Sequence, residues 1–336
     1  MTLRLAISGF GRIGRMTLRA LQESARNDIE VVLINSPGPV ETSAHLYEYD
    51  SVHGRSKTGV SYGDDWLDIG RGKIHMTRHR NPADIPHKEL DIDVVLECSG
   101  KFNDRDKSSL HLDAGAKKIL ISAPCRTADQ TIVYGVNHDQ LRSDSVILSN
   151  ASCTTNGLAP VAKILSDGLG IEAGYMTTIH AYTGDQAVLD ASHKDLRRAR
   201  AAGLSMIPTS TGATSAVGEV LPELKGKMNG SAIRVPTANV SVIDLTIMSS
   251  RDTSTEEVND LLKTAANGSM KGVLGINERP LVSVDFNHDP HSSIADLEQT
   301  SVLNNRLVRV LAWYDNEWGF SCRMLDNAAL IGNTLS

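Results

Sequence analysis

The fold of this chain is decided by residues 3–14, LRLAISGFGRIG. The first five form a short apolar run typical of a buried strand, and a G-x-G-x-x-G pattern follows at Gly9, Gly11 and Gly14. Such glycines let the chain turn tightly and let a pyrophosphate approach the N-terminus of the next helix, where free N–H groups favour an anion. The stretch therefore predicts a dinucleotide site, and an unliganded glycine-rich turn is the weaker alternative.

The first half of the chain continues this alternation of strand and helix. Ile13, Met16 and Ala20 fall on one helical face, and a second apolar run follows at 29–34. Further short apolar runs stand at 94–96, 119–121 and 146–148. Strands that alternate with helices predict an α/β fold, a Rossmann-type parallel sheet with helices on both faces.

After residue 151 the pattern changes. A helical stretch at 158–165 is followed by longer apolar runs, at 176–179, 232–235, 240–247 and 307–313. They predict an α+β domain on a large, mostly antiparallel sheet, and the final segment is helical in pattern. We therefore expect a dinucleotide-binding domain at 1–151, onto which a C-terminal helix at 318–336 packs back, and a catalytic domain at 152–317.

Composition and charge narrow the class of protein. The 336 residues carry a formal charge of −6, so no electrostatic feature favours a nucleic acid or a membrane as partner. Neither a signal-peptide pattern nor an apolar run of membrane-spanning length is present, and we expect a cytoplasmic protein. The four cysteines lack the paired spacing of a metal site and are too sparse for a disulfide framework. We therefore expect no metal and reduced thiols.

The end of the second predicted strand bears on the choice of cofactor. Dinucleotide folds that prefer NAD usually carry an acidic residue there, which binds the ribose 2′-hydroxyl. Here the run at 29–34 continues as Asn35-Ser36-Pro37. An acid repels a 2′-phosphate, whereas a serine can donate a hydrogen bond to it, so Ser36 favours NADP or the use of both cofactors. The alternatives are an acid supplied by Glu41, or a serine that only caps a turn.

One cysteine differs from the others in its surroundings. The segment 149–156, SNASCTTN, precedes the helical stretch, so Cys153 lies near a helix N-terminus among small polar residues. A helix N-terminus stabilises a thiolate and lowers the thiol pKa, as a nucleophilic cysteine requires. Cys98, Cys125 and Cys322 lack such surroundings and are expected to be inert.

A histidine and a set of possible anion ligands follow. His180 ends the run at 176–179 and precedes AYTGDQ, residues 181–186. Scattered threonine, glycine and arginine residues can build an anion site, although an arginine-rich stretch is more often a solvated face or an interface. From spacing alone this segment is only suggestive. Its arginines are Arg197, Arg198, Arg200 and, later, Arg234.

Together these motifs resemble a known family. The segment 149–156, the turn GFGRIG at 9–14 and WYDNEWG at 313–319 are similar to the phosphorylating glyceraldehyde-3-phosphate dehydrogenases. So are YDSVHG at 49–54 and LPELKG at 221–226. The resemblance covers essentially the whole chain, and the cysteine motif is its most specific part.

The resemblance implies a reaction in two stages. Cys153 attacks the aldehyde of glyceraldehyde 3-phosphate, and His180 takes the thiol proton and assists hydride departure to NAD or NADP. Inorganic phosphate then attacks the thioester and gives 1,3-bisphosphoglycerate, so one hard step is split into two. The family also implies a homotetramer of glycolysis or gluconeogenesis, in which the segment 183–205 lines the cofactor groove at a subunit interface.

The same resemblance implies the site residues. Those implied for the cofactor are Gly9, Gly11, Arg12, Ile13, Gly14, Ser36, Arg80, Ser122, Ser192 and Asn316, the last for the nicotinamide carboxamide. Those implied for the substrate phosphate are Thr183, Asp185 and Arg234. Those implied for the attacking phosphate are Ser152, Thr154, Thr211 and Gly212, with Arg198 close to both.

Four positions depart from the family pattern. Ser8 replaces a usual asparagine, and Gly157 replaces a second cysteine that is often present. Ser36 replaces the usual acid. Ala191-Ser192 stands where strictly NAD-using members often carry Leu-Pro, and it resembles chloroplast-type members that accept NADP. Ser36 and Ser192 therefore both favour NADP.

Two other functions compete with this interpretation. Erythrose-4-phosphate dehydrogenase, a sister enzyme, shares the cysteine and the histidine, but it lacks the Thr183-Gly184 step found here. A non-catalytic scaffold with the same fold is the second candidate. An inactive relative is expected to lose the nucleophile or the base, and this chain keeps both.

Overall fold

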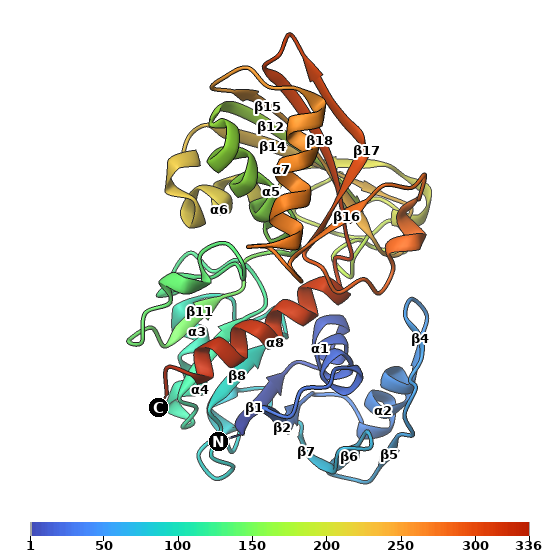
Figure 1. Ribbon diagram of the computed structural model, residues 1–336. Helices are drawn as coiled ribbons and strands as arrows, with labels where there is room; N and C mark the ends of the chain where they lie inside the picture. The colour runs from blue at the N-terminus through green and yellow to red at the C-terminus, as the bar shows by residue number, and fades with distance from the viewer. Residues whose placement is uncertain (1, 336) are drawn as a thin grey trace. The chain divides into compact units, whose positions relative to one another are not determined.

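The computed structural model describes residues 2–335 and divides into two compact units (Figure 1). The first unit holds the residues up to Ser152 together with those from Ser321 onward, and the second unit holds Cys153–Phe320. Among the described residues, no helix is both long enough and apolar enough to cross a membrane.

A nine-stranded sheet forms the centre of the first unit, in the order β10-β11-β9-β8-β1-β2-β7-β6-β5. Every pair from β10 to β7 is parallel, and the last two pairs are antiparallel. The predicted Rossmann-type sheet is confirmed. Its strands are β1 (Leu3–Ser8), β2 (Ile29–Asn35), β5 (Ser61–Tyr62), β6 (Trp66–Asp68), β7 (Lys73–Thr77), β8 (Val94–Glu97), β9 (Lys118–Ile121), β10 (Gln130–Thr131) and β11 (Ile147–Ser149).

The helices of the first unit connect these strands. The glycine turn leads directly into the first of them, and a small separate hairpin is formed by β3 (Tyr49–Asp50) and β4 (Gly54–Arg55). The helices are α1 (Arg12–Glu23), α2 (Val40–Glu48), α3 (Arg105–Ser108) and α4 (Leu110–Asp113).

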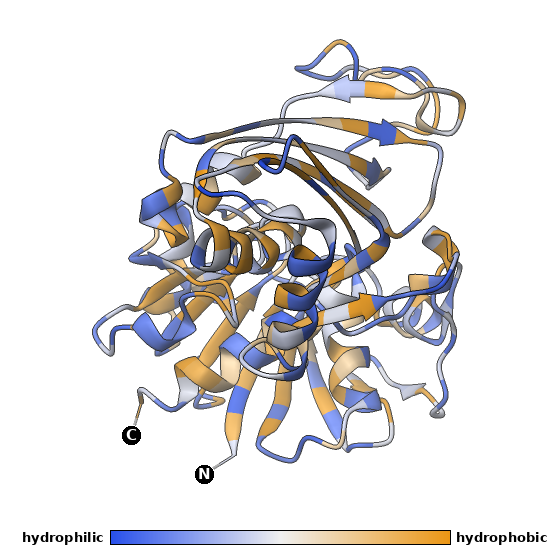
Figure 2. Ribbon diagram, turned by 45° about the horizontal axis from the view of Figure 1, so that its top comes forward, coloured by the Kyte–Doolittle hydropathy of each residue, from blue (hydrophilic) through white to orange (hydrophobic). Residues whose placement is uncertain are grey.

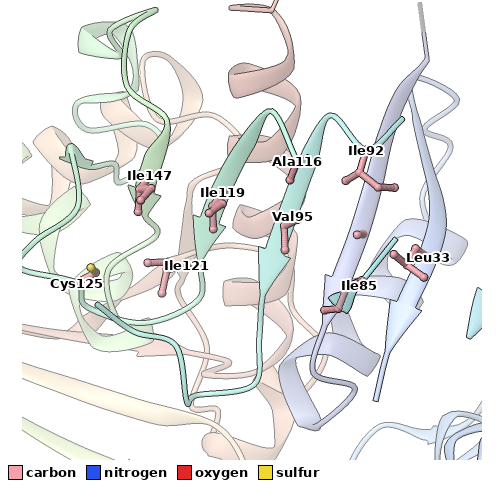
Figure 3. Close-up of a cluster of buried hydrophobic side chains, with 10 residues drawn as sticks. Leu33, Ile85, Ile92, Val95, Ala116, Ile119, Ile121, Cys125 and Ile147 are labelled. Atoms are coloured by element: carbon pink, nitrogen blue, oxygen red, sulfur yellow. The ribbon is translucent and has the colours of Figure 1, made fainter. Parts of the chain in front are cut away.

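The core of the first unit explains why its strands have continuous apolar sequences. Every residue of β8 and β9 is buried, as expected for parallel strands covered on both faces. In one core cluster, Leu33, Val95, Ile119, Ile121 and Ile147 project from adjacent strands (Figure 3). Hydropathy colouring shows mostly hydrophobic strands in this sheet and mostly hydrophilic connections (Figure 2).

The helix α8 (Trp318–Gly332) starts four residues before the run at 322–335 whose pattern is helical. From Ser321 onward it is part of the first unit. Asn327 Nδ2 donates to Asn150 Oδ1 at 2.6 Å, and Lys118 Nζ donates to Thr334 Oγ1 at 2.7 Å. A Cβ on Gly332 would lie 2.7 Å from Leu3 Cδ1, so the end of the helix packs closely on β1.

A seven-stranded sheet forms the second unit, in the order β13-β14-β12-β15-β18-β17-β16. Four of its six strand pairs are antiparallel, which confirms the mostly antiparallel sheet. Its strands are β12 (Ile171–Ala181), β13 (Ile207–Thr209), β14 (Met228–Val235), β15 (Ser241–Ser249), β16 (Leu274–Asn277), β17 (Ser293–Leu303) and β18 (Leu307–Tyr314).

Three helices pack against this sheet. The helix α5 (Cys153–Leu169) packs on the central strands, α6 (Ala213–Val220) on β14 and α7 (Thr255–Asn267) on β16 and β17 (Figure 1). Burial alternates residue by residue along β18, because one of its faces is covered. The apolar run at 240–247 was expected to form one strand, but β15 begins only at Ser241 because Val240 has a φ of 66°.

Candidate active site

A cavity of about 550 Å³ lies in the first unit beside the glycine turn. It is lined by residues 8–11, 35–37, 79–80, 98–99 and 101–102. A Cβ on Gly9 would lie 2.5 Å from Ser99 Cα, and one on Gly14 would lie 2.2 Å from Gly9 O, so these two glycines are required by packing. A Cβ on Gly11 would meet nothing within 4 Å. The open space at Gly11, next to the N-terminus of α1, fits a dinucleotide pyrophosphate.

Arg12 and Ile13 form the first turn of α1, and Arg12 is held by a carboxylate. Its Nη2 donates to Asp50 Oδ1 at 3.2 Å, and its Nη1 contacts Asp50 Oδ2. Burial opposes ionisation of Asp50, but hydrogen bonds from Arg12 and from the N–H groups of His53 and Val52 outweigh it and lower the Asp50 pKa to about 2. Asp50 therefore stays charged and fixes the Arg12 guanidinium beside the glycine turn.

Ser36 and Arg80 line the same cavity. The Asn35 side chain holds the backbone of His79, the residue before Arg80: Asn35 Oδ1 accepts from His79 N at 2.9 Å, and Asn35 Nδ2 donates to His79 O at 3.0 Å. Arg80 and Lys101 are the basic side chains of the lining, and no lining residue is acidic. Glu41, the alternative source of an acid, lines a different hollow at α2.

A chain of buried polar side chains supports one wall of this cavity. Glu97 is fully buried, and its Oε1 accepts from Ser99 N at 2.7 Å and from Ser99 Oγ. Its Oε2 lies 3.1 Å from His111 Nε2, and His111 Nδ1 lies 2.9 Å from His87 Nε2. Burial, together with the neighbouring His111, lowers the His87 pKa to about 3. Glu97 O also accepts from Ser122 N at 3.0 Å.

Cys153 is the first residue of α5 in the second unit. Two residues earlier, Ala151 has a φ of 57°, in the left-handed region that a residue with a side chain rarely adopts. Ser152 joins this strained residue to the helix, so the backbone turns sharply just before Cys153. Strain of this kind is typical of functional sites, where the surrounding structure holds it in place.

The thiol faces a neutral imidazole. Cys153 Sγ lies 3.4 Å from His180 Nε2, and His180 Nδ1 lies 2.6 Å from Ala181 O. A carbonyl oxygen can only accept, so this shorter contact assigns the proton to Nδ1 and leaves Nε2 free to accept one, although Arg234 Nη1, a donor, lies 2.8 Å from the same Nδ1. Burial and the positive charges of Arg234 and Arg198 lower the His180 pKa to about 3, although the Ala181 hydrogen bond opposes this.

The Cys153 pKa differs from the expectation. Burial raises the pKa of this thiol, even though Arg234 and hydrogen bonds from Thr154 and the helix start act to lower it. The predicted lowering by the helix N-terminus is therefore wrong in direction, because loss of water outweighs it. The two pKa shifts favour a neutral thiol beside a neutral imidazole.

Arg234 reaches this pair from the adjacent strand. His180 on β12 and Arg234 on β14 are directly opposite in the parallel register. Arg234 Nη1 lies 2.8 Å from His180 Nδ1 and donates to Ala181 O at 2.9 Å. A fixed positive charge at this distance disfavours imidazolium and favours a negative charge on sulfur or on a bound phosphate.

The predicted phosphate residues fall into two groups. Asp185 Oδ2 accepts from Arg198 Nη1 at 2.6 Å, and Thr183 N donates to Gln186 Oε1 at 3.0 Å. Arg198 also donates to Thr209 Oγ1 at 2.9 Å and to Ser210 O at 3.3 Å, so it braces the 209–211 segment. Thr211 and Gly212 lead directly into α6.

The remaining predicted residues lie as follows. Thr154 Oγ1 is 3.0 Å from Tyr314 OH, which also lies 2.8 Å from Thr178 Oγ1. Asn316 is buried and accepts a hydrogen bond from Ser241, whereas Ser192 is exposed on the 182–206 segment. A Cβ on Gly157 would lie 3.0 Å from Ile243 Cδ1 and 3.2 Å from Tyr314 Cγ, so a larger residue there requires these side chains to shift by a few tenths of an ångström.

Comparison with known proteins agrees with this geometry. Residues 3–105 match the family model "Glyceraldehyde 3-phosphate dehydrogenase, NAD binding domain", and residues 152–316 match "Glyceraldehyde 3-phosphate dehydrogenase, C-terminal domain". The glyceraldehyde-3-phosphate dehydrogenase of Xanthobacter flavus is 61% identical over 99% of both chains. The chain belongs to the glyceraldehyde-3-phosphate dehydrogenase family.

Other members of the glyceraldehyde-3-phosphate dehydrogenase family match as fully. Those of Cereibacter sphaeroides and Pseudomonas aeruginosa are 60% and 58% identical, over 100% and 98% of both chains. The predicted family and enzyme class are confirmed, and the protein is a dehydrogenase that uses NAD(P).

The sequence did not single out several residues that build the glyceraldehyde-3-phosphate dehydrogenase site. Asp50 and Tyr314 lie within the family motifs quoted above, so the sequence marked their positions. It did not indicate their roles. Glu97 and Ser241 carry no local signal. Their hydrogen-bond partners are His111 for Glu97 and Asn316 for Ser241.

Proposed function

We propose that the protein oxidises glyceraldehyde 3-phosphate through a covalent Cys153 adduct and releases 1,3-bisphosphoglycerate by phosphorolysis. The observation that carries this proposal is the 3.4 Å approach of Cys153 Sγ to the free nitrogen of a neutral His180. A weak nucleophile and a base at this distance form an activated pair. Family membership supplies the substrate class.

In the first stage His180 Nε2 removes the thiol proton and the sulfur adds to the aldehyde carbon. The resulting oxyanion is placed at the start of α5, where backbone N–H groups such as that of Cys153 can donate to it. The imidazolium returns the proton to this oxygen and gives a neutral thiohemiacetal. Bound NAD(P)⁺ supplies the hydride acceptor.

In the second stage His180 takes the hydroxyl proton as the hydride leaves, so the carbon becomes a thioester. Inorganic phosphate attacks this carbon and the C–S bond breaks. The leaving thiolate is protonated by His180, which restores both neutral partners. Arg234 keeps the imidazolium short-lived, because its charge favours return of the proton.

We assign the two phosphate positions to the residues around this pair. Thr183, Asp185 and Arg234 serve the substrate phosphate, and Ser152, Thr154, Thr211 and Gly212 serve the attacking phosphate. Arg198 supports both, because its bonds to Asp185 and to the 209–211 segment tie the two groups together. Asp185 partly neutralises Arg198 and is expected to move aside when a phosphate dianion binds.

The cofactor proposal concerns the 2′-position of the adenosine ribose. Ser36 and Arg80 lie on one wall of a cavity whose lining contains no acid, which supports efficient use of NADP. Ser192 is the second residue assigned to this preference. A Ser36→Asp variant is expected to lower kcat/KM for NADP at least tenfold while that for NAD changes little or rises. An equal loss with both cofactors contradicts this role.

Assembly is proposed from an exposed apolar surface. Between residues 186 and 206, five large apolar side chains are 72–88% exposed: Val188, Leu189, Leu196, Leu204 and Met206. Such a concentration is typical of an interface. We propose that it is covered in a homotetramer, and a cytoplasmic location is proposed with it. Sedimentation equilibrium at micromolar concentration checks the assembly, and a monomer contradicts it.

The activity is tested by steady-state rates on two aldehydes. We expect phosphate-dependent oxidation of glyceraldehyde 3-phosphate at a kcat/KM well above that for erythrose 4-phosphate. Stoichiometric alkylation of Cys153 by iodoacetamide is expected to abolish it. A higher rate on erythrose 4-phosphate, independent of inorganic phosphate, supports the sister enzyme, and a thiol that reacts slowly, with no turnover, supports a scaffold.

A further inference from the structure

Ser241 occupies a special position in the second unit. It is the first residue of β15, it is 1% exposed, and the residue before it, Val240, has a φ of 66°. The antiparallel ladder between β12 and β15 ends at the pair Ile179 and Val242. The Ala181 N–H lies beyond this ladder and donates instead to Ser241 Oγ at 3.0 Å. The serine hydroxyl thus replaces a backbone acceptor at the strand end.

The other side of the same hydroxyl holds Asn316. Because the Ala181 N–H can only donate, the Ser241 oxygen accepts there and its single hydrogen is free. Ser241 Oγ donates this hydrogen to Asn316 Oδ1 at 2.8 Å. The amide oxygen of Asn316 is thereby held toward Ser241. The amide nitrogen is the end of the side chain left to donate to a ligand.

The Ala181 peptide extends this link to the catalytic base. Its N–H is tied to Ser241, and its carbonyl oxygen lies 2.6 Å from His180 Nδ1. The carbonyl also accepts from Arg234 Nη1 at 2.9 Å. The Ser241 hydroxyl and the Ala181 peptide therefore connect Asn316 to the Nδ1 side of the His180 ring. His180, Ser241 and Asn316 are all at most 4% exposed, so water does not readily replace a lost contact.

We infer that Ser241 is a positioning residue that presents the Asn316 amide N–H to the nicotinamide carboxamide and pins the Ala181 peptide that orients His180. The inference rests on the proposed role of Asn316 in binding the carboxamide. Ser241 itself touches no reacting atom. Its hydroxyl sets the direction of one hydrogen-bond donor for the cofactor and of one acceptor for the base.

The test compares binding of each dinucleotide with binding of its ADP-ribose fragment, which lacks the nicotinamide. Calorimetric titrations are made with NAD⁺ against ADP-ribose, and with NADP⁺ against the 2′-phosphorylated fragment. In Ser241→Ala, we expect dinucleotide affinity to fall about three- to tenfold, the effect of one lost hydrogen bond, and fragment affinity to stay unchanged. Ser241→Thr keeps the hydroxyl in a strand that accepts a β-branched residue, and it is expected to restore the parent dinucleotide affinity.

A second measurement follows the base without any cofactor. The rate of Cys153 alkylation by iodoacetamide is recorded against pH for the same variants. Ser241→Ala is expected to slow the reaction near neutral pH, because the Ala181 peptide that holds the His180 tautomer loses its tie. Ser241→Thr is expected to restore the parent rate. A purely structural role for Ser241 predicts an equal loss of fragment and dinucleotide binding, and that result overturns the inference.

Asn316→Ala separates this inference from the proposed function. If Asn316→Ala weakens dinucleotide binding alone and Ser241→Ala has no effect, Asn316 keeps its role and the inference about Ser241 is wrong. If neither variant discriminates between dinucleotide and fragment, the proposed role of Asn316 is itself wrong.

Discussion

Two buried histidines in this protein have similar protonation states and opposite uses. His87 in the first unit and His180 in the second both have their pKa lowered to about 3, mainly by burial. His87 donates to His111, which in turn donates to Glu97, and the other ring nitrogen of His87 is buried with no partner among the described residues. His180 instead directs its free nitrogen at a thiol 3.4 Å away. A neutral imidazole becomes a base only where its lone pair meets a proton donor.

The charge beside each histidine sharpens the contrast. The chain from His87 ends on a carboxylate that is fully buried and engaged by a serine and a histidine. His180 has an arginine at its Nδ1 instead. Because Arg234 disfavours imidazolium, the mechanism proposed above has His180 hold a second proton only while negative charge exists on sulfur or on the substrate oxygen. The first arrangement supports the 98–102 loop, and the second is the one that we propose to transfer a proton.

Replacing each histidine with a residue that carries a neutral amide is expected to give the largest difference between the two sites. His180→Asn is expected to lower kcat about 10²–10⁴-fold, because general base catalysis is lost while the fold is kept. His87→Gln, the matched control, is expected to leave kcat within about twofold, because its loss costs only a buried hydrogen bond. Steady-state kinetics with circular dichroism check both. Equal losses of kcat in the two variants contradict the distinction.

Removing the charge beside His180 is the next test. Arg234→Gln is expected to raise the pKa of both His180 and Cys153, since the positive charge lowers both. The base must be neutral and the thiol must lose its proton, so the alkaline rise of Cys153 alkylation moves to higher pH. Alkylation rates between pH 5 and 10 measure this shift. Arg197→Gln, at an exposed arginine of the same region, is expected to leave the profile unchanged.

Changing the carboxylate of the first unit has a smaller expected effect. Glu97→Gln keeps one oxygen acceptor for Ser99 but places an amide N–H against the His111 Nε2–H. We expect about 1–3 kcal/mol of lost stability, together with weaker binding of ADP-ribose because the 98–102 loop loses its support. Denaturant unfolding and calorimetry measure the two effects. Glu89→Gln, at an exposed position, serves as control, and an unchanged Glu97→Gln variant refutes the supporting role.

The last test concerns the pH dependence of stability. A histidine whose pKa is lowered on folding binds a proton only when unfolded, so stability falls as pH falls below about 6.5. His87 and His180 are expected to contribute up to about 1.4 kcal/mol per pH unit each between pH 6.5 and 5, above the range of carboxylate titration. Unfolding at fixed protein concentration measures the slope. His87→Gln is expected to flatten it, whereas the exposed control His45→Gln is not.

Much of the fold was predictable because local patterns determine it. The run at residues 3–7 and the glycines after it require a strand, a turn and a helix, and the buried strands of the first unit have no polar alternation. The exact start of β15 was not predictable. The backbone of Val240 is left-handed, which a β-branched sequence does not indicate.

The site residues were predictable where a short sequence motif contains them. Cys153 precedes a helical pattern, and family motifs select His180. The direction of the Cys153 pKa was not predictable, because it depends on burial by distant residues. The pairing of His180 with Arg234, 54 residues away, follows from the register of two parallel strands. No local sequence pattern determines that register.

The position of α8 has a consequence for synthesis on the ribosome. The second unit consists of consecutive residues, 153–320, whereas the first unit also needs residues from Ser321 onward. Asn150 is hydrogen-bonded to Asn327 of that late segment, and Lys118 to its Thr334. The first unit begins to be translated before the second, but it is complete only when residues from Ser321 onward have been made. A polypeptide whose synthesis stops before Ser321 therefore lacks these contacts of its nucleotide unit.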